Sequence, residues 1–489
     1  MNMKEFFLKN IIKKFDNISS RALKYKDYET ALEAISSSAM FQYMYNQTYI
    51  DTSSENNLLK IANSFNVPNM HSNDRNAILF YDGFGLDNRG LALVYIKALI
   101  NLGFHIIYVT LSDSGDDQPT LLDILKQADA KIYIQKNCFT QNEKIEYLNE
   151  ILDREHFDNA FFYSTPWDVS GIVSFNAHKN KFNRFLINLT DHAFWLGLNS
   201  FDYIIEFRDY GACVSNKYRK IDKEKIFKLP FYPEISKLEE FKGFPFESEN
   251  KIIVTSGGAI YKTIDNDDQY YKLVTSIIEL DDRIVFYYIG DGDFSKLDTL
   301  KKKYPSKVFF SNSRKDFFEV IKNSNYYLNT YPIGGNLMLQ FAAKAKCVPV
   351  SLRREWDDDA KDVFINEKEL NYSFTNCKDL LEDFKTLIND KSYYDKKLSL
   401  LDKSLVSEND FSNSLEMIIT KKQSNYVIDY YDINTDKFIK AYLNNVKFID
   451  VIDWAVTRNQ KKAMKHFPLL CICKLFLKIK NKLGVNLWK

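Results

Sequence analysis

Two adjacent glycines, Gly334 and Gly335, follow a strand-like run that ends at Tyr331-Pro332 and precede a helix-like segment near Asn336. Glycine lets the backbone approach a ligand closely, and the N-terminus of a helix offers N–H groups and a positive dipole end to an anion. This order predicts a phosphate-binding loop to which Tyr331, Gly334, Gly335 and Asn336 contribute. The alternative is an ordinary tight turn between a strand and a helix.

Two more glycine loops repeat the pattern upstream. Lys251 to Thr255 runs into Ser256-Gly257-Gly258, and Arg283 to Ile289 runs into Gly290-Asp291-Gly292. Ligands of parallel sheets bind beyond the carboxyl ends of the strands, which is where all three loops fall. The predicted anion site therefore also includes Ser256, Gly257, Gly258, Gly290 and Asp291.

A histidine and an aspartate follow a strand-like run in the first half of the chain. Asp191 and His192 come after Phe185 to Leu189, so we expect them at the carboxyl end of a strand. A neutral imidazole can deprotonate a hydroxyl or bind a diphosphate, and Asp191 can serve as a base or can orient the ring. The alternative is a structural histidine beside Trp195.

The loop after the first strand-like run is also polar. Asp82-Gly83 follows Ala77 to Tyr81, and Asn88 and Arg89 come shortly after. Such side chains can bind the hydroxyl groups or the charge of an acceptor, so we predict Asp82, Gly83, Asn88 and Arg89 as acceptor residues. A turn built on Asp-Gly is the alternative.

These loops need strands and helices to position them, and the hydrophobic pattern supplies both. Continuous apolar runs separated by helical periods indicate βαβ units with parallel sheets. The upstream runs are Ala77 to Tyr81, His105 to Leu111, Lys131 to Ile134, Ala160 to Tyr163 and Phe185 to Leu189. With 489 residues, the chain is long enough for two Rossmann-like α/β domains, predicted at residues 77–235 and 245–404.

The order of these segments resembles the two-domain glycosyltransferases of the GT-B fold. Between Asn188 and Pro230, the motifs LTDHAFWLG, FDYIIEFRDYG and KYRKIDKEKIFKLP resemble the O-GlcNAc transferase and bacterial adhesin-glycosyltransferase group. In the C-terminal half, SGGAIYKT, IGDGD and NTYPIGGN match the order of the donor-binding loops of that fold. The resemblance extends roughly from Ile78 to Leu400.

The resemblance implies transfer of a sugar from a nucleoside diphosphate donor, expected to be UDP-linked, to a hydroxyl acceptor. Lys262, just past the first glycine loop, is then the predicted cation for the diphosphate, and a solvated surface lysine is its alternative. Asp291-Gly292-Asp293 could hold a divalent metal, but we expect a turn there, no metal and no cofactor. The glutamates of retaining enzymes are missing, since Asn336 and Ala342 stand near their expected places, and inversion is predicted.

Three other functions are weighed against this one. The missing carboxylates favour a non-catalytic GT-B partner of an active transferase, and a protein O-glycosyltransferase is a second alternative. A dehydrogenase fits less well, because no strand leads into an intact Gly-x-Gly-x-x-Gly with an acidic residue about 20 positions later.

The two ends of the chain carry helical patterns. Residues 1–76 predict a helical cap. The spacing in YETALEAISSSA is typical of one helix pair of a tetratricopeptide repeat, but a single pair does not make a repeat array. Residues 405–489 form an extension, and its last part, 466–489, predicts a basic amphipathic helix. Its apolar face is Leu469, Ile472, Phe476, Ile479 and Leu483, opposite Lys474, Lys478 and Lys482. This pattern fits an anionic membrane surface, or alternatively packing on the protein itself.

Composition narrows the compartment and the partners. Six cysteines without metal-ligand spacing agree with a reducing environment. No segment has the roughly 20 apolar residues that span a bilayer, and the N-terminus lacks the pattern of a cleavable signal. We therefore expect a cytoplasmic protein that binds no nucleic acid. Together with the basic tail, the resemblance implies a bacterial enzyme, peripheral on the inner membrane face, that acts in capsule or lipopolysaccharide biosynthesis.

Overall fold

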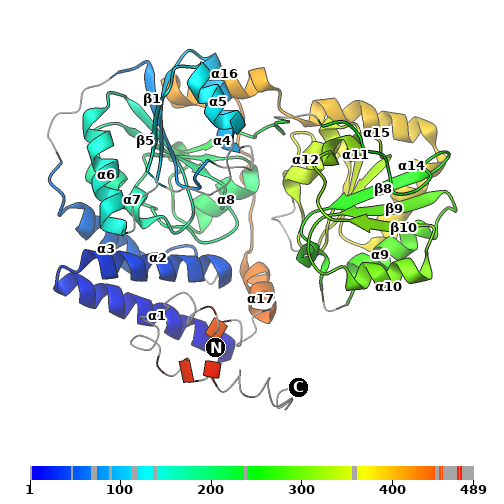
Figure 1. The fold of residues 1–489 in the computed structure, drawn as a ribbon, viewed down its shortest axis with the longest axis horizontal. Helices are drawn as coiled ribbons and strands as arrows, with labels where there is room; N and C mark the ends of the chain where they lie inside the picture. The colour runs from blue at the N-terminus through cyan, green and yellow to red at the C-terminus, as the bar shows by residue number, and fades with distance from the viewer. Residues whose placement is uncertain are drawn as a thin grey trace. The chain divides into compact units, whose positions relative to one another are not determined.

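The computed structural model describes residues 3–45, 48–67, 74–86, 91–111, 119–135, 140–235, 239–265, 267–354 and 361–445, together with 451, 452, 454, 468, 471, 472, 474 and 475. They form two compact α/β units (Figure 1). The first unit comprises the described parts of 1–207, 211–228 and 429–489. The second comprises those of 208–210 and 229–428.

The first unit is built on a parallel sheet with the strand order β3-β2-β1-β4-β5-β6-β7. Its strands are β1 (Ala77–Asp82), β2 (His105–Thr110), β3 (Lys131–Ile134), β4 (Asn159–Tyr163), β5 (Asn183–Asn188), β6 (Tyr203–Glu206) and β7 (Ile226–Lys228). The connecting helices are α4 (Leu91–Asn101), α5 (Pro119–Gln127), α6 (Gln141–Arg154), α7 (Val169–Ala177), α8 (Asp209–Lys217) and a 3-10 turn at Lys223–Lys225. The central strands are buried along their length, which explains their uninterrupted apolar sequence.

The register of this sheet aligns the polar residues at the strand ends. Asp82 at the end of β1 pairs with Tyr163 at the end of β4, and Asn188 at the end of β5 pairs with Glu206 at the end of β6. Because the strands are parallel, these residues share the carboxyl edge of the sheet. The direction of strand order reverses between β1 and β4, the position where ligands bind in such sheets.

Helices from both ends of the chain complete the first unit. The N-terminal cap consists of α1 (Met3–Lys24), α2 (Tyr28–Tyr45) and α3 (Thr52–Ala62), as the sequence predicted. The helix α17 (Asp436–Asn445) returns to it, since Leu443, Val451 and Trp454 pack in one apolar cluster with Phe15 and Phe41. Figure 1 shows α1, α2 and α17 close together below the sheet.

The second unit has a parallel sheet with the order β10-β9-β8-β11-β12-β13. Its strands are β8 (Ile252–Gly257), β9 (Ile284–Ile289), β10 (Val308–Ser311), β11 (Tyr326–Leu328), β12 (Val348–Leu352) and β13 (Ser373–Phe374). Its helices are α9 (Gln269–Ile278), α10 (Ser295–Lys303), α11 (Phe317–Lys322), α12 (Asn336–Lys344), α13 (Glu367–Leu370), α14 (Cys377–Asn389), α15 (Lys391–Ser404) and α16 (Glu408–Lys421), and a 3-10 turn spans Ile260–Thr263. The strand order reverses between β8 and β11, so the loops after these strands lie at the switch point.

The C-terminal extension differs in organisation from the single segment predicted at 405–489. Its first part, including α16, belongs to the second unit, and the described residues from Asp429 onward belong to the first. The predicted amphipathic helix at 466–489 lies almost wholly outside the described residues. Of its predicted faces, Ile472 and Lys474 are described, and Ile472 is exposed.

Candidate functional site

The three predicted glycine loops of the second unit are hydrogen-bonded to one another. The Gly258 N–H donates to the Ile289 carbonyl (3.0 Å) and the Ile260 N–H to the Asp291 carbonyl (2.9 Å), which joins the loops after β8 and β9. The Ile333 N–H donates to the Lys262 carbonyl (3.2 Å), which joins the loop after β8 to that after β11. The structure thus brings the predicted donor residues together at one edge of one sheet.

Close backbone approach explains the glycines in the first two of these loops. A Cβ on Gly290 would lie 1.8 Å from the Gly258 carbonyl oxygen, a distance that no side chain tolerates. Gly258 has φ +125° and Gly292 has φ +131°, conformations that favour glycine. Gly257 is also packed tightly, because its Cβ would meet the Phe317 ring at 2.4 Å.

The two aspartates of the Asp291-Gly292-Asp293 loop both bind nearby groups of the turn. The Ser313 N–H (3.2 Å) and hydroxyl donate to Asp291 and hold its pKa below the ordinary value. Asp293, just before α10, accepts from the N–H of Ser295, the first residue of that helix (2.9 Å). These contacts are those of an Asp-Gly turn, the structure that we predicted for this segment.

Asn329 shapes the loop that leads into α12. Its side-chain oxygen accepts the N–H groups of Thr330 (3.0 Å) and Gly335 (2.9 Å), and its amide donates to the Ser351 hydroxyl (3.1 Å). Gly335 is the N-cap residue of α12, so the helix begins at Asn336 as the sequence predicted. Gly334 and Asn336 are only half-buried, so the first turn of α12 reaches the surface of the unit, where an anion can approach its N–H groups.

Lys262 lies beside this helix N-terminus, within the 3-10 turn that follows β8. Its side chain is half-buried, and burial lowers the pKa of its ammonium group. Within the described part of the chain, no carboxylate forms an ion pair with Lys262. A partly desolvated cation beside a helix N-terminus favours an anionic ligand.

Ser256 and Tyr331 are placed differently from the backbone groups of the loops. Ser256 is fully buried, and its hydroxyl accepts from the Tyr270 hydroxyl of α9 (2.6 Å), which directs its side chain into the unit. Tyr331 is half-buried and packs against the core under the sheet. Donor contacts of these two residues stay predictions. Among the loop glycines, Gly258, Gly334 and Gly335 are half-buried, whereas Gly257 and Gly290 are buried.

His192 and Asp191 lie at the carboxyl edge of the first sheet. The His192 ring is 29% exposed and its Nδ1 lies 3.3 Å from Asp191 Oδ1, whereas the Asp191 side chain is 1% exposed. Burial removes Asp191 from direct contact with a substrate hydroxyl. Of the two roles predicted for Asp191, the geometry favours orientation of the imidazole.

A buried polar network holds the loop that carries His192. Asn188 accepts the Thr190 N–H (2.9 Å) and donates to Glu206 Oε1 (2.8 Å). The Arg219 guanidinium donates to the carbonyls of Thr190 (3.1 Å), Asp191 (3.0 Å) and Ala193 (2.6 Å). It also lies over the rings of Tyr49 and Trp195, at 5.1 and 5.0 Å from their centroids.

Glu206 is the most unusual member of this network. It is fully buried, and Oε2 has no hydrogen-bond partner among the described residues, whereas Oε1 accepts from Asn188 and from Ser215 (2.5 Å). Burial, together with the negative charge of Asp191, raises the pKa of Glu206 to about 7, against the opposing charge of Arg219. This acid therefore changes charge near neutral pH behind the His192 loop.

The predicted acceptor residues lie partly inside the unit and partly outside the described chain. Asp82 is fully buried and accepts the Tyr108 hydroxyl (2.6 Å) and the N–H groups of Phe84 (2.9 Å) and Gly85 (3.2 Å). A Cβ on Gly83 would collide with Ser164 at 1.8 Å, so this glycine serves packing. Asn88 and Arg89 lie outside the described residues. Acceptor binding at these positions stays a prediction.

Sequence reasoning missed three residues of the His192 network. Asn188 and Glu206 are polar residues at the ends of apolar strands, and that position was the available signal. Arg219 has no such signal in the sequence, because it follows a helix and reaches the His192 loop only in the folded unit. Glu55 of α3 was missed for the same reason, although it accepts the N–H groups of Gly197 (2.8 Å) and Leu198 (3.2 Å) beyond His192.

Comparison with known proteins reveals structural rather than sequence similarity. The sequence matches no family model. It also matches no curated protein. Among solved structures, an O-GlcNAc transferase of Thermobaculum terrenum aligns with a TM-score of 0.50 at 13% identity, over 88% of this chain and 81% of that one.

Two further structures show the range of proteins with this architecture. A glycosyltransferase of Rickettsia africae aligns with a TM-score of 0.51 at 14% identity, over 72% of this chain and 100% of that one. A Listeria monocytogenes protein assigned as a UDP-N-acetylglucosamine 2-epimerase aligns with a TM-score of 0.50 at 10% identity, over 74% of this chain and 100% of that one. The two parallel sheets with their helices therefore confirm the predicted GT-B fold, the architecture of these glycosyltransferases.

Proposed function

We propose that this chain is a glycosyltransferase that moves a sugar from a nucleoside diphosphate donor, UDP-linked, to a hydroxyl acceptor. The observation that carries the proposal is the group of three hydrogen-bonded glycine loops around Lys262 and the N-terminus of α12. A diphosphate needs backbone donors and a cation, and this edge of the second sheet offers both. One structural neighbour is named for a UDP-sugar, which supports uridine as the base.

The proposed reaction is a single displacement. The acceptor oxygen forms a bond to the anomeric carbon as the bond from that carbon to the diphosphate oxygen breaks, and the electron pair leaves with the diphosphate. Lys262 and the N–H groups of α12 stabilise the charge that develops there, so no metal is required. His192 accepts the acceptor proton, with Asp191 orienting its ring, and the anomeric configuration is inverted.

The proposed acceptor is a bacterial surface glycan, such as a capsule or lipopolysaccharide precursor on a lipid carrier, assembled at the inner membrane face. The basic pattern of residues 466–489 supports this choice. In the described part of the chain, no helix combines the length and hydropathy needed to span a bilayer. Flotation with anionic vesicles, with and without 466–489, tests the attachment; loss of flotation on truncation is expected. Absence of flotation by the full-length chain favours the alternative of a protein acceptor.

A non-catalytic partner of an active transferase is the second candidate. It is favoured by Asn336 and Ala342, which stand near the positions of the glutamates in retaining enzymes. Such a partner binds nucleotide or acceptor without turnover, so a measurement that separates binding from turnover distinguishes the two.

Release of nucleoside diphosphate from UDP-, GDP-, dTDP- and CMP-sugars, measured with EDTA present, tests the enzyme proposal. We expect the parent to release nucleoside diphosphate from one donor. The rate of release should fall roughly a hundredfold in Lys262→Ala, as it does when one charge-stabilising donor is removed from an active site. Lys272→Ala is the matched control, because Lys272 is an exposed lysine of α9 in the same unit. Equal losses in both lysine variants contradict the assignment of Lys262.

His192→Ala tests the acceptor side, with His156→Ala as the control for an exposed histidine of the same unit. General-base catalysis typically contributes about a hundredfold or more in rate, so His192→Ala should lose that much turnover while its nucleotide affinity stays unchanged. Thermal stabilisation by UDP without turnover in the presence of candidate acceptors supports the non-catalytic partner.

A further inference from the structure

The first unit contains a cavity of about 1140 Å³ at the amino ends of its strands. It is lined by the first residues of β5 and β6 and by the connections that lead into β4, β5, β6 and β7, together with Ile50, Thr52 and Leu59 from the N-terminal helical region. Asp191 and His192 follow the opposite, carboxyl end of β5. The lining includes neither a residue of the predicted donor loops nor Asp191 or His192 themselves. It does include Arg219, which holds the His192 loop.

Basic side chains outnumber acidic ones around this cavity. Among the described lining residues, six are basic and three acidic, although the whole chain has a net charge of only +1. The basic residues come mainly from two connections, 178–182 between α7 and β5 and 218–225 between α8 and β7. The neighbouring positions of β5, β6 and β7 in the sheet bring these two basic connections to one opening.

Two of the acidic residues pair with cations of the cavity itself, one of them strongly and the other weakly. Asp202 accepts from Arg184 at both oxygens (3.0 and 2.8 Å), and Arg184 holds its pKa below the ordinary value. Asp222 pairs with Lys225 at 3.5 Å, but both side chains are more than half exposed, so that pair is weak. For Lys179, the described residues include no ion-pair partner. The opening therefore keeps an excess of positive charge.

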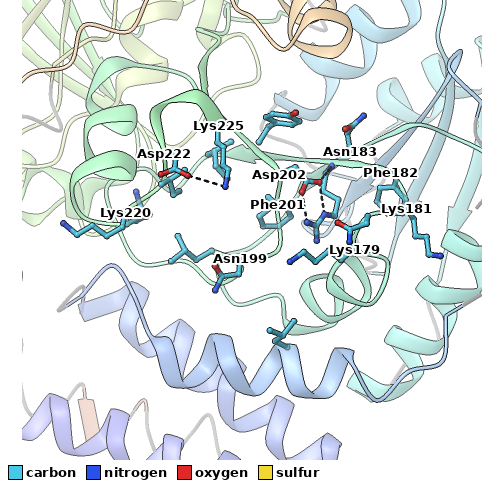
Figure 2. A pocket seen from close by; sticks show the side chains of 18 of the residues that line it. Lys179, Lys181, Phe182, Asn183, Asn199, Phe201, Asp202, Lys220, Asp222 and Lys225 are labelled. Atoms are coloured by element: carbon cyan, nitrogen blue, oxygen red, sulfur yellow. Dashed lines mark hydrogen bonds and ion pairs between the residues drawn. The ribbon is translucent and has the colours of Figure 1, made fainter. Parts of the chain in front are cut away.

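The side chains in Figure 2 show which lysines serve the opening. Lys179 and Lys225 point toward its centre from opposite sides, whereas Lys181 and Lys220 point away from it. Lys220 also donates to the Lys217 carbonyl (2.8 Å), which engages its ammonium group elsewhere. Lys179 and Lys225 are thus the pair that can converge on one ligand.

The rest of the lining suits the body of a small polar molecule. Apolar groups of Leu59, Leu198 and Ile221 lie beside the amide of Asn199 and the ring of Tyr203. A mixed surface of this kind accommodates a sugar ring, which has apolar faces and hydroxyl edges. The volume of about 1140 Å³ slightly exceeds the usual range for ligand pockets, roughly 300 to 1,000 Å³, so a small ligand leaves part of the cavity to water.

We propose that this cavity is a binding site for a phosphate-bearing sugar compound. Lys179 and Lys225 bind the phosphate group, and the apolar and amide groups between them hold the sugar. A phosphate monoester carries between one and two negative charges at neutral pH, which two lysines balance. A sugar phosphate and a nucleoside monophosphate share this chemistry, and either would bind at the amino ends of the strands, opposite to the carboxyl edge that carries His192.

Hydrogen-exchange mass spectrometry with glucose 1-phosphate and with AMP tests the site, because it locates the ligand by the peptides that it protects. At least one compound is expected to protect peptides covering 178–185 and 219–226. In Lys179→Gln/Lys225→Gln the affinity should fall at least roughly tenfold, since hydrogen bonds to charged groups contribute about 1.5 to 3 kcal/mol each. Which compound protects these peptides identifies the source of the phosphate.

A double variant with the same change of charge serves as the control. Lys126→Gln/Lys272→Gln removes two exposed lysines that do not line the opening and should keep the parent affinity. Arg219 is left unchanged because it holds the His192 loop. Absence of protection by both compounds overturns the proposal, as does equal affinity loss in the two double variants or protection that persists in Lys179→Gln/Lys225→Gln.

Discussion

Glu206 makes the pH dependence of stability a sensitive probe of the first unit. Its pKa is about 7 in the folded protein, compared with an ordinary value of 4.5 that we assign to the unfolded chain. Below pH 4.5 the carboxyl is protonated in both states, and folding is not penalised. As the pH rises from 4.5 to about 7, the unfolded chain loses this proton while the folded unit keeps it. Stability therefore falls over this window and levels off above it.

The expected loss follows from the two pKa values. A difference of one pKa unit corresponds to about 1.4 kcal/mol, so Glu206 alone lowers the free energy of unfolding by about 3 kcal/mol between pH 4.5 and pH 8. Glu206→Gln removes this titration but keeps a carbonyl oxygen for Asn188 and Ser215. Relative to the parent, the free energy of unfolding of Glu206→Gln should consequently rise by about 3 kcal/mol as the pH is raised over this window.

Urea unfolding of the parent and Glu206→Gln at pH 5, 6, 7 and 8 measures this difference. Hydrogen exchange of peptides from β5 and β6 should report it, because these strands carry the network and belong to one unit. A constant cost of burying the glutamine amide cancels in the comparison across pH. Parallel profiles for the two proteins would refute the reasoning that Glu206 is held neutral by burial beside Asp191.

Four further substitutions test other parts of the structure. Glu55→Gln should also flatten the stability profile between pH 4.5 and 7, since burial raises the pKa of Glu55 to about 7; the urea midpoints across pH check this, and an unchanged slope would be inconsistent with it. Arg219→Met should destabilise the first unit by about 3 kcal/mol or more, because buried carbonyls lose a charged donor. It should also speed hydrogen exchange in residues 190–196, and unchanged exchange there would argue against the role of Arg219 in holding the His192 loop. Gly290→Ala should destabilise the second unit by more than about 2 kcal/mol, because its Cβ would meet the Gly258 carbonyl. Gly335→Ala should cost less than about 1 kcal/mol, because its Cβ would meet Met338 at an ordinary 3.5 Å. Thermal unfolding compares the two variants, and equal costs would contradict the loop geometry.

Most of the fold could be predicted because its strands are uninterrupted apolar runs. Strands such as β1 and β9 are buried along their whole length, and burial on both faces produces that pattern directly. β11 is only Tyr326–Leu328, and the longer apolar run around it continues into the loop, so its limits were less well defined. β13, a pair of residues at a sheet edge, left no periodic signal.

The candidate site was predictable where function lies in the backbone. Glycine loops and helix starts leave a local signature, and Lys262 was predicted as a donor residue because it follows one of them. Side-chain environments were not predictable in the same way. Ser256 is turned inward by a tyrosine from the next helix, and Arg219 reaches carbonyls 26 to 29 positions earlier in the chain. Both contacts exist only after the sheet has formed.

The cavity at the amino ends of the first sheet shows the same limit. Lys179 and Lys225 are separated by two strands and a helix in the sequence, and nothing local distinguishes them from other surface lysines. Their convergence follows from the neighbouring positions of β5, β6 and β7.

Calorimetric titration of UDP into the parent protein, Lys262→Ala and Lys272→Ala, with EDTA present, tests the central claim most directly. Saturable binding by the parent and Lys272→Ala is expected, together with an affinity lower by roughly tenfold or more in Lys262→Ala, as for loss of one charge-assisted hydrogen bond. Absence of UDP binding by the parent, or equal affinities in all three proteins, would contradict the assignment of the glycine loops and Lys262 as a diphosphate site.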